Sequence, residues 1–266
     1  MPDIIYVDFA AKKVKQTEEV ITPRRSLATG MIAPASTQVE SLVVEEHAAD
    51  PIKSVQDIER VSEQLIRTGR YRDNMLFIVG INLGLRVSDL VGLRFADLIN
   101  PDFTFKTTFP VLEKKTRNTR KVKRNRYLTI NEAVMDAVEL YLQHHPSKLD
   151  DYMFRSESNR GSNKNKPLDP YSVERLLKKV AAEVGLTCHV ATHTLRKTFG
   201  YHQMAMSNND SRKLLLLQKI FGHSSVAQTL EYIGITDDEI QDAYLGLNLG
   251  NKNCYAKFSS IHEVVG

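Results

Sequence analysis

The 266-residue sequence has few cysteines and no long apolar run, and each absence narrows the class of protein. Its two cysteines, Cys188 and Cys254, match neither a metal-ligand spacing nor a disulfide framework. A transmembrane helix needs about 18 consecutive apolar residues, and the longest candidate, 75–85, is interrupted by glycine and asparagine. The first residues lack the charged-then-apolar order of a signal peptide. We therefore expect a soluble, cytoplasmic protein without a membrane partner.

Signatures of nucleotide hydrolysis and of metal-dependent nucleases are also missing. No Walker-type glycine-rich loop and no Gly-x-Gly-x-x-Gly segment occurs. The acidic clusters that hold two magnesium ions in nucleases are not evident near the motifs described below. The sequence therefore predicts neither a metal site nor a bound cofactor.

Charge is unevenly distributed along an otherwise ordinary globular composition. Apolar residues make up 42% and charged residues 26%, which argues against wholesale disorder. Residues 1–50 hold five basic and eight acidic residues, whereas 51–266 hold 31 and 24. Between 106 and 126, nine Lys and Arg residues accompany one acid, Glu113. Such a run is either a solvated, self-repelling hairpin or a surface for a polyanion whose phosphates it neutralises.

Three segments differ in their residue pattern. Residues 1–53 show no sustained helical period and are interpreted as an arm or linker, partly disordered until a partner orders it. Order resumes at Ser54, a predicted N-cap with Asp57 three residues later. We expect one folded domain over 54–250 and a C-terminal tail over 251–266.

The pattern within this domain is mostly helical. Apolar spacing predicts a buried helix over 75–83, a short helix from a Ser88 cap to Leu98, and a helix capped by Asn131. Residues 103–130 favour strands and predict a small sheet whose turn carries the basic run. Further helices are expected at 171–184, 194–206, 211–221 and 237–248. The predicted fold class is α+β, mostly α with a small antiparallel β-sheet.

Several residues with useful chemistry stand in short motifs, each of them ambiguous alone. Arg86, in the block Gly-Leu-Arg-Val-Ser-Asp-Leu, fits a surface ion pair at a helix start as well as a binding site. His193 and Arg196 are three residues apart and share a helix face, which is common for surface pairs. His223, in Gly-His-Ser, fits local packing in a turn, and Tyr232 fits the edge of a core.

Together and in this order, the motifs resemble the tyrosine recombinase (phage integrase) family. The resemblance covers roughly 54–247 and rests on the Arg86 block, a Lys in the basic run, His-x-x-Arg, Gly-His-Ser, and a Tyr nine residues after that His. It implies the fold of that family's catalytic domain, the DNA breaking-rejoining enzyme fold. It also implies a catalytic set of Arg86, Lys115, His193, Arg196, His223 and Tyr232.

Phosphodiester cleavage needs residue types of this kind. Attack on phosphorus adds charge to the non-bridging oxygens, and Arg86 and Arg196 offer guanidinium groups that stay protonated and bind oxyanions bidentately. His223 can supply a third donor. Tyr232 carries a phenol with a pKa of about 10, which becomes a nucleophile when nearby cations favour the phenolate and a base accepts its proton. His193 is the candidate base.

The remaining assignments follow from the resemblance. The family's hairpin lysine protonates the departing 5′ oxygen, and here it corresponds to Lys115, with the neighbouring Lys114 as the alternative. Asp89 stands where the family has a carboxylate that orients the first arginine. The basic side chains expected to contact DNA are Lys114, Arg117, Arg120, Lys121 and Lys123.

The implied function is site-specific recombination of double-stranded DNA through a covalent 3′-phosphotyrosine, serving integration, excision or inversion of a mobile element. The implied assembly is a homotetramer on synapsed DNA. The helical core-binding domain of most relatives does not fit before residue 54, so we expect an accessory DNA-bending or core-binding partner, or a flexible arm. Two alternatives are a DNA-binding accessory protein with the same fold, which need not keep all six residues, and a type IB topoisomerase-like relaxing enzyme.

Overall fold

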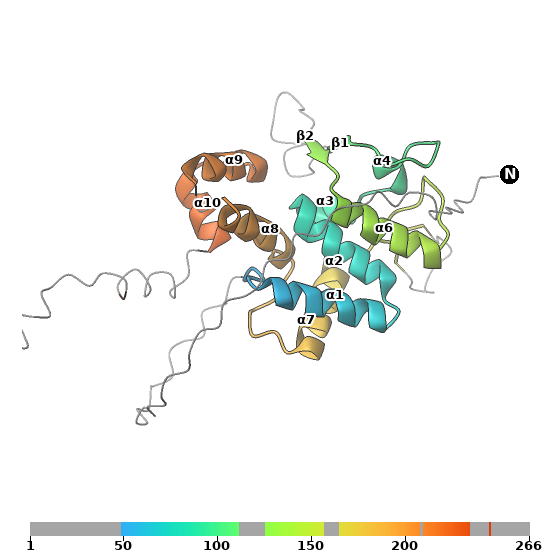
Figure 1. Cartoon of the computed structure of the whole chain (residues 1–266), viewed down its shortest axis with the longest axis horizontal. Helices are drawn as coiled ribbons and strands as arrows, with labels where there is room; N and C mark the ends of the chain where they lie inside the picture. The colour runs from blue at the N-terminus through green and yellow to red at the C-terminus, as the bar shows by residue number, and fades with distance from the viewer. Residues whose placement is uncertain (1–48, 112–125, 157–164, 208–209, 235–244, 246–266) are drawn as a thin grey trace, which may run out of the picture.

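The computed structural model describes residues 49–111, 126–156, 165–207, 210–234 and 245 (Figure 1). The first helices are α1 (Val55–Arg67), α2 (Tyr71–Leu83), α3 (Val87–Leu90) and α4 (Phe95–Leu98). Two strands follow, β1 (Thr108–Val111) and β2 (Arg126–Thr129). The later helices are α6 (Glu132–His144), α7 (Pro170–Val184), α8 (Thr194–Ala205), α9 (Ser211–Phe221) and α10 (Val226–Ile233). In these ranges no helix is both long and apolar enough to cross a membrane.

The sheet is small and antiparallel, as the sequence predicts. Thr108 pairs with Thr129, and Phe109 pairs with Leu128. The Phe109 and Leu128 side chains are buried while their strand neighbours are more exposed, which is the alternation of a sheet covered on one face. The predicted α+β class, mostly α, is confirmed.

Helix α2 lies at the centre of the main core and packs against α1, α6 and α8. It is apolar around most of its circumference, because Met75, Leu76, Phe77 and Val79 are all fully buried. Gly80 allows α8 to approach closely, since a Cβ at this position would lie 2.6 Å from a methyl carbon of Leu195. The end of α2 is thereby fixed against the start of α8.

Helices α8, α9 and α10 together form a second, smaller hydrophobic core. Its buried members are Met204, Leu217, Phe221 and Ile233. In Figure 1 these three helices, brown to orange, form a group at one side of the main body. Within the described residues, α8 therefore links two packed units, the main body and the α9–α10 unit.

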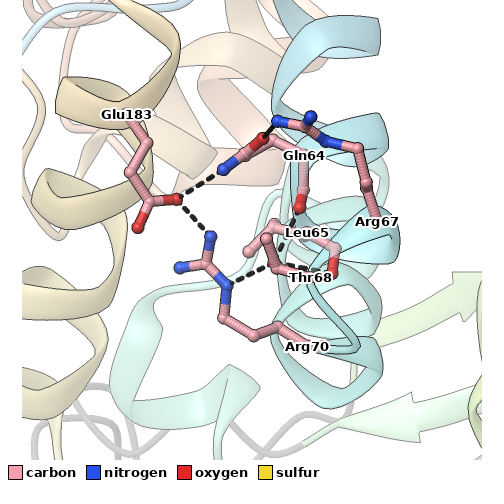
Figure 2. A network of polar contacts seen from close by, with 6 residues as sticks. All are labelled: Gln64, Leu65, Arg67, Thr68, Arg70 and Glu183. Atoms are coloured by element: carbon pink, nitrogen blue, oxygen red, sulfur yellow. Dashed lines mark hydrogen bonds and ion pairs between the residues drawn. The ribbon is translucent and has the colours of Figure 1, made fainter.

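A network of polar side chains connects the end of α1 with the end of α7 (Figure 2). Glu183 in α7 accepts a hydrogen bond from Gln64 Nε2 at 3.1 Å and forms an ion pair with Arg70. These hydrogen bonds lower the pKa of the Glu183 carboxyl. Figure 2 shows Arg67 and Thr68 completing the network at the end of α1. The network anchors the end of α7, whose chain leads on to α8.

Local capping signals predict two helix starts correctly and one wrongly. The Ser54 side chain accepts from the Asp57 amide, and the Asn131 side chain accepts from the Val134 amide, as N-caps do. The prediction of a helix from a Ser88 cap to Leu98 is wrong, because Ser88 lies inside α3. A turn after α3 breaks the helix, and the Asp97 carboxylate then accepts from the Arg94 amide to start α4.

The division into 1–53, 54–250 and 251–266 stays a prediction, because most of the arm and the whole tail lie outside the described residues. The predicted helix at 237–248 also falls outside them, apart from Leu245.

Candidate active site

The structure brings together five of the six predicted catalytic side chains. Arg86 follows the end of α2 and caps α3, and His193 precedes α8, in which Arg196 lies one turn on. His223 lies between α9 and α10, and Tyr232 lies in the last turn of α10. These residues are far apart in the sequence, so their meeting is a property of the fold.

The Tyr232 phenol is hydrogen-bonded to the His193 imidazole. The distance from His193 Nδ1 to Tyr232 Oη is 2.9 Å. The rings meet edge to face, with centroids 5.9 Å apart. This distance is within the range for direct proton transfer between a base and a hydroxyl. His193 is therefore placed to take the phenolic proton.

Burial and positive charge act in opposite directions on Tyr232. Burial raises the pKa of its phenol above the ordinary value, because the phenolate is poorly solvated there. The positive charges of Arg196 and Arg86 and a hydrogen bond from Arg196 lower the pKa, but burial is the larger influence. The phenol therefore stays protonated near neutral pH and needs a base to become a nucleophile.

The two arginines share one backbone acceptor, the carbonyl oxygen of Phe221. Arg196 Nη2 donates to this oxygen at 3.0 Å, and Arg86 Nη2 donates to it at 3.3 Å. Arg196 Nη1 also donates to the Gly84 carbonyl at 2.6 Å. Both carbonyls lie at helix carboxyl ends, where the partial negative charge offsets the repulsion between two guanidinium groups. The arrangement holds two cations side by side.

Two glycines in left-handed conformation end the helices that supply these carbonyls. Gly84 ends α2 with φ 57°, and Gly222 ends α9 with φ 66°. A Cβ at Gly84 would lie 2.5 Å from the Phe199 ring. Glycine is therefore required at position 84 both by conformation and by contact.

His223 is oriented by a threonine in α10. Its Nδ1 lies 3.0 Å from Thr229 Oγ1, and this hydroxyl donates its hydrogen to the Ser225 carbonyl at 3.2 Å. With its hydrogen directed at the Ser225 carbonyl, the hydroxyl can accept a hydrogen bond from a protonated Nδ1 of His223. The His223 ring also meets Tyr232 edge to face, with centroids 5.0 Å apart. This contact places His223 beside Tyr232.

Other predicted residues are placed less fully. Asp89 is buried in α3, and its amide donates to the Arg86 carbonyl at 2.9 Å. The basic residues Lys114, Lys115, Arg117, Arg120, Lys121 and Lys123 lie outside the described residues. In the part of the chain that is described, no group of three His, Cys, Asp or Glu side chains is arranged to hold a metal ion.

Two basic residues at the site were missed as site residues. Lys197 Nζ lies 5.6 Å from the Tyr232 ring centroid, and burial lowers the pKa of its ammonium group. Its position directly after Arg196 was the available signal. Arg126 donates from Nη1 to the Ile220 carbonyl at 2.8 Å and from Nη2 to the Leu83 carbonyl at 3.2 Å. In the sequence, Arg126 stands out only as the last residue of the basic run.

Comparison with known proteins identifies the family. The sequence profile of the phage integrase family matches residues 53–239. The chain belongs to this family. It is 36% identical over 198 residues to the probable integrase/recombinase YoeC of Bacillus subtilis, covering 74% of this chain and 96% of YoeC. It is 30% identical over 179 residues to the tyrosine recombinase XerC of Oceanobacillus iheyensis, covering 65% of this chain and 52% of XerC. The chain thus spans about half the length of this XerC.

Solved structures show the same fold. The crystal structure of XerA recombinase superimposes with a TM-score of 0.53 at 22% identity, covering 77% of this chain and 68% of XerA. The Tn1549 transposon integrase in complex with a circular intermediate DNA gives 0.52 at 18% identity, again covering 77% and 68%. The predicted fold of the tyrosine recombinase catalytic domain is confirmed.

Proposed function

We propose that this integrase-family chain is a tyrosine-type site-specific recombinase, which cleaves and rejoins DNA strands through a 3′-phosphotyrosine. The observation that carries the proposal is the 2.9 Å hydrogen bond from Tyr232 to His193, beside the paired guanidinium groups of Arg86 and Arg196. A nucleophile, its base and two permanent cations are the groups that attack on a phosphodiester requires.

Residues of this chain can accept and supply both protons that the cleavage step transfers. His193 takes the phenolic proton as Tyr232 Oη attacks phosphorus, and the bond between phosphorus and the 5′ oxygen breaks. The departing oxygen receives a proton from Lys115, with Lys114 as the alternative donor. Rejoining reverses these steps, with the 5′ hydroxyl of another strand attacking the phosphotyrosine.

The charge that develops on the phosphate is met by three donors. Arg86 and Arg196 present planar guanidinium groups, which fit two phosphate oxygens at once. His223, protonated at Nδ1 toward Thr229, donates to the phosphate from Nε2 when it is doubly protonated. Asp89 orients the Arg86 side chain and does not itself contact DNA.

Double-stranded DNA is the proposed partner, held as a synaptic homotetramer in the cytoplasm. XerH was solved bound to its difH substrate, and the Tn1549 transposon integrase was solved with a circular intermediate DNA, which supports DNA as the ligand of this chain. The basic run over 106–126 supplies the phosphate contacts. We also propose that the arm over 1–53 or an accessory protein adds further contacts to DNA.

A nicked suicide duplex tests the proposal, because loss of the short cleaved strand traps the covalent intermediate. Duplexes tiled across the DNA that flanks the gene are incubated with the full chain, denatured and separated on a gel. We expect an adduct with the wild type on one or a few sites. DNA binding without any adduct would indicate an accessory protein, and relaxation of supercoiled plasmid at many unrelated sites would indicate a topoisomerase.

A further inference from the structure

The carboxyl ends of α2 and α9 are joined by two guanidinium groups, which make parallel bridges. Arg196 bridges Gly84 O and Phe221 O. Arg126, from the start of β2, bridges the preceding carbonyl of each helix, Leu83 O at 3.2 Å and Ile220 O at 2.8 Å. Two successive carbonyls of each helix end are thus used in register. Arg126 and Arg196 make equivalent connections, although Arg126 lies outside the motifs quoted in the sequence analysis.

The two helix ends belong to differently packed units. Helix α2 is part of the main core, which also positions Arg86. Helix α9 shares the smaller core with α10, which carries Tyr232. The alignment of the nucleophile with Arg86 therefore depends on how these two units are held together. Among the described residues, two kinds of contact hold these units together. The first is the packing of α9 and α10 on α8, and the second is the pair of arginine bridges.

We propose that Arg126 is a positioning residue that aligns Tyr232 with the arginine pair. The inference rests on the function proposed above. By fixing the Ile220 carbonyl, Arg126 fixes the next carbonyl, that of Phe221, which both Arg86 and Arg196 use as an acceptor. In this role Arg126 acts through the Phe221 carbonyl.

Arginine is the residue that this role demands. Its planar fork places two Nη groups at a fixed spacing, so one side chain can reach two carbonyls at once. A lysine has a single nitrogen on a flexible stem and cannot reproduce the bridge. The partial negative charge at both helix ends further favours a cation between them.

Arg94 provides a matched control. Its guanidinium also donates to a backbone carbonyl, that of Asp150, and lies over the Tyr152 ring with the guanidinium carbon 4.0 Å from the centroid. It is bound to the main core away from α9 and α10. Arg94→Lys thus removes a comparable interaction without affecting the bridge.

The experiment compares Arg126→Lys and Arg126→Ala with Arg94→Lys in the full chain, on the suicide duplex that the wild type cleaves. We expect the single-turnover cleavage rate at saturating DNA to fall by roughly 10–100-fold in both Arg126 variants, as is typical when partners that orient a reacting site are lost. DNA affinity and the melting temperature should change little in Arg126→Lys. The Arg94 variant should cleave like the wild type.

Two further measurements separate positioning from other roles. In a double-mutant cycle with Arg86→Lys, the losses should be smaller than multiplicative, because both residues act through the Phe221 carbonyl. Hydrogen exchange, which does not depend on cleavage, should quicken in α9 and α10 in Arg126→Lys but not in Arg94→Lys. Wild-type rate and exchange in Arg126→Lys would overturn the proposal, as would weakened DNA binding with an unchanged saturated rate. A wild type that forms no adduct, with exchange changed as expected, would contradict the proposed function but keep the bridge.

Discussion

His193 and Tyr232, 39 residues apart in the sequence, share a 2.9 Å hydrogen bond between Nδ1 and Oη. The proposed base and the proposed nucleophile thus lie within the distance for direct proton transfer. Burial raises the pKa of the phenol even though the positive charges of Arg196 and Arg86 lower it, so Tyr232 needs a base to lose its proton near neutral pH.

The titration of Tyr232 should reveal the opposing effects of burial and of the two arginines on the pKa of its phenol. We expect its phenol to ionise at higher pH than an ordinary tyrosine, because burial raises its pKa. Arg86→Ala should move the ionisation to still higher pH, because it removes a charge that lowers this pKa. Phenolate absorbance, measured as the difference from Tyr232→Phe, would show both effects. A shift to lower pH in Arg86→Ala would contradict the electrostatic account.

Lysine should not replace arginine in the pair. Arg86→Lys and Arg196→Lys should each lose about 3–4 kcal/mol of transition-state stabilisation, as for the loss of an oxyanion-hole donor. For Arg196 the reason is visible, because one ammonium group cannot serve both Gly84 O and Phe221 O. Single-turnover cleavage of the suicide duplex measures the loss. Wild-type cleavage by Arg86→Lys would refute the assignment.

The general acid can be identified with a substrate whose bridging 5′ oxygen is replaced by sulfur, which leaves without protonation. Lys115→Ala should be inactive on the normal duplex and restored on the sulfur-containing one. Arg86→Ala should be inactive on both. Lys114→Ala and Lys197→Ala are the informative comparisons, since Lys197 is the lysine that the structure places near Tyr232. Rescue confined to either of these variants would move the role to that residue.

Thr229 should matter through His223. Thr229→Val removes the oxygen that accepts from His223 Nδ1, so we expect cleavage to slow by roughly tenfold, or about 1.4 kcal/mol. Thr229→Ser keeps the hydroxyl and should cleave nearly as fast as the wild type. Equal rates in the valine and serine variants, measured at saturating DNA, would show that this contact does not orient the imidazole.

The sequence predicted the side chains of the site better than their supports. Arg86, His193, Arg196, His223 and Tyr232 stand in motifs whose order is informative, and the structure brings them together. The Phe221 carbonyl has no such signal, because every residue carries a backbone oxygen and only the fold decides which one faces a guanidinium group.

For the fold, too, features that depend on neighbouring residues were predictable, whereas features that depend on distant contacts were not. Ser54 and Asn131 were read correctly because an N-cap acts within three residues. Ser88 misled because the break after α3 depends on contacts made later in the chain, where the Ala96 amide donates to the Leu149 carbonyl. The role of Arg126 likewise depends on α9 and β2 meeting in space, which no local pattern records.

The covalent linkage itself tests the central claim most directly. The trapped adduct is digested with protease and nuclease, and mass spectrometry locates the nucleotide on the peptide. We predict a nucleotide joined through its 3′ phosphate to Tyr232, and no adduct from Tyr232→Phe although that variant still binds DNA. Tyr201→Phe, which changes another tyrosine of the same half of the molecule, should form the adduct normally. A nucleotide on Tyr244, Tyr255 or any other residue, or one joined through its 5′ phosphate, would contradict the account.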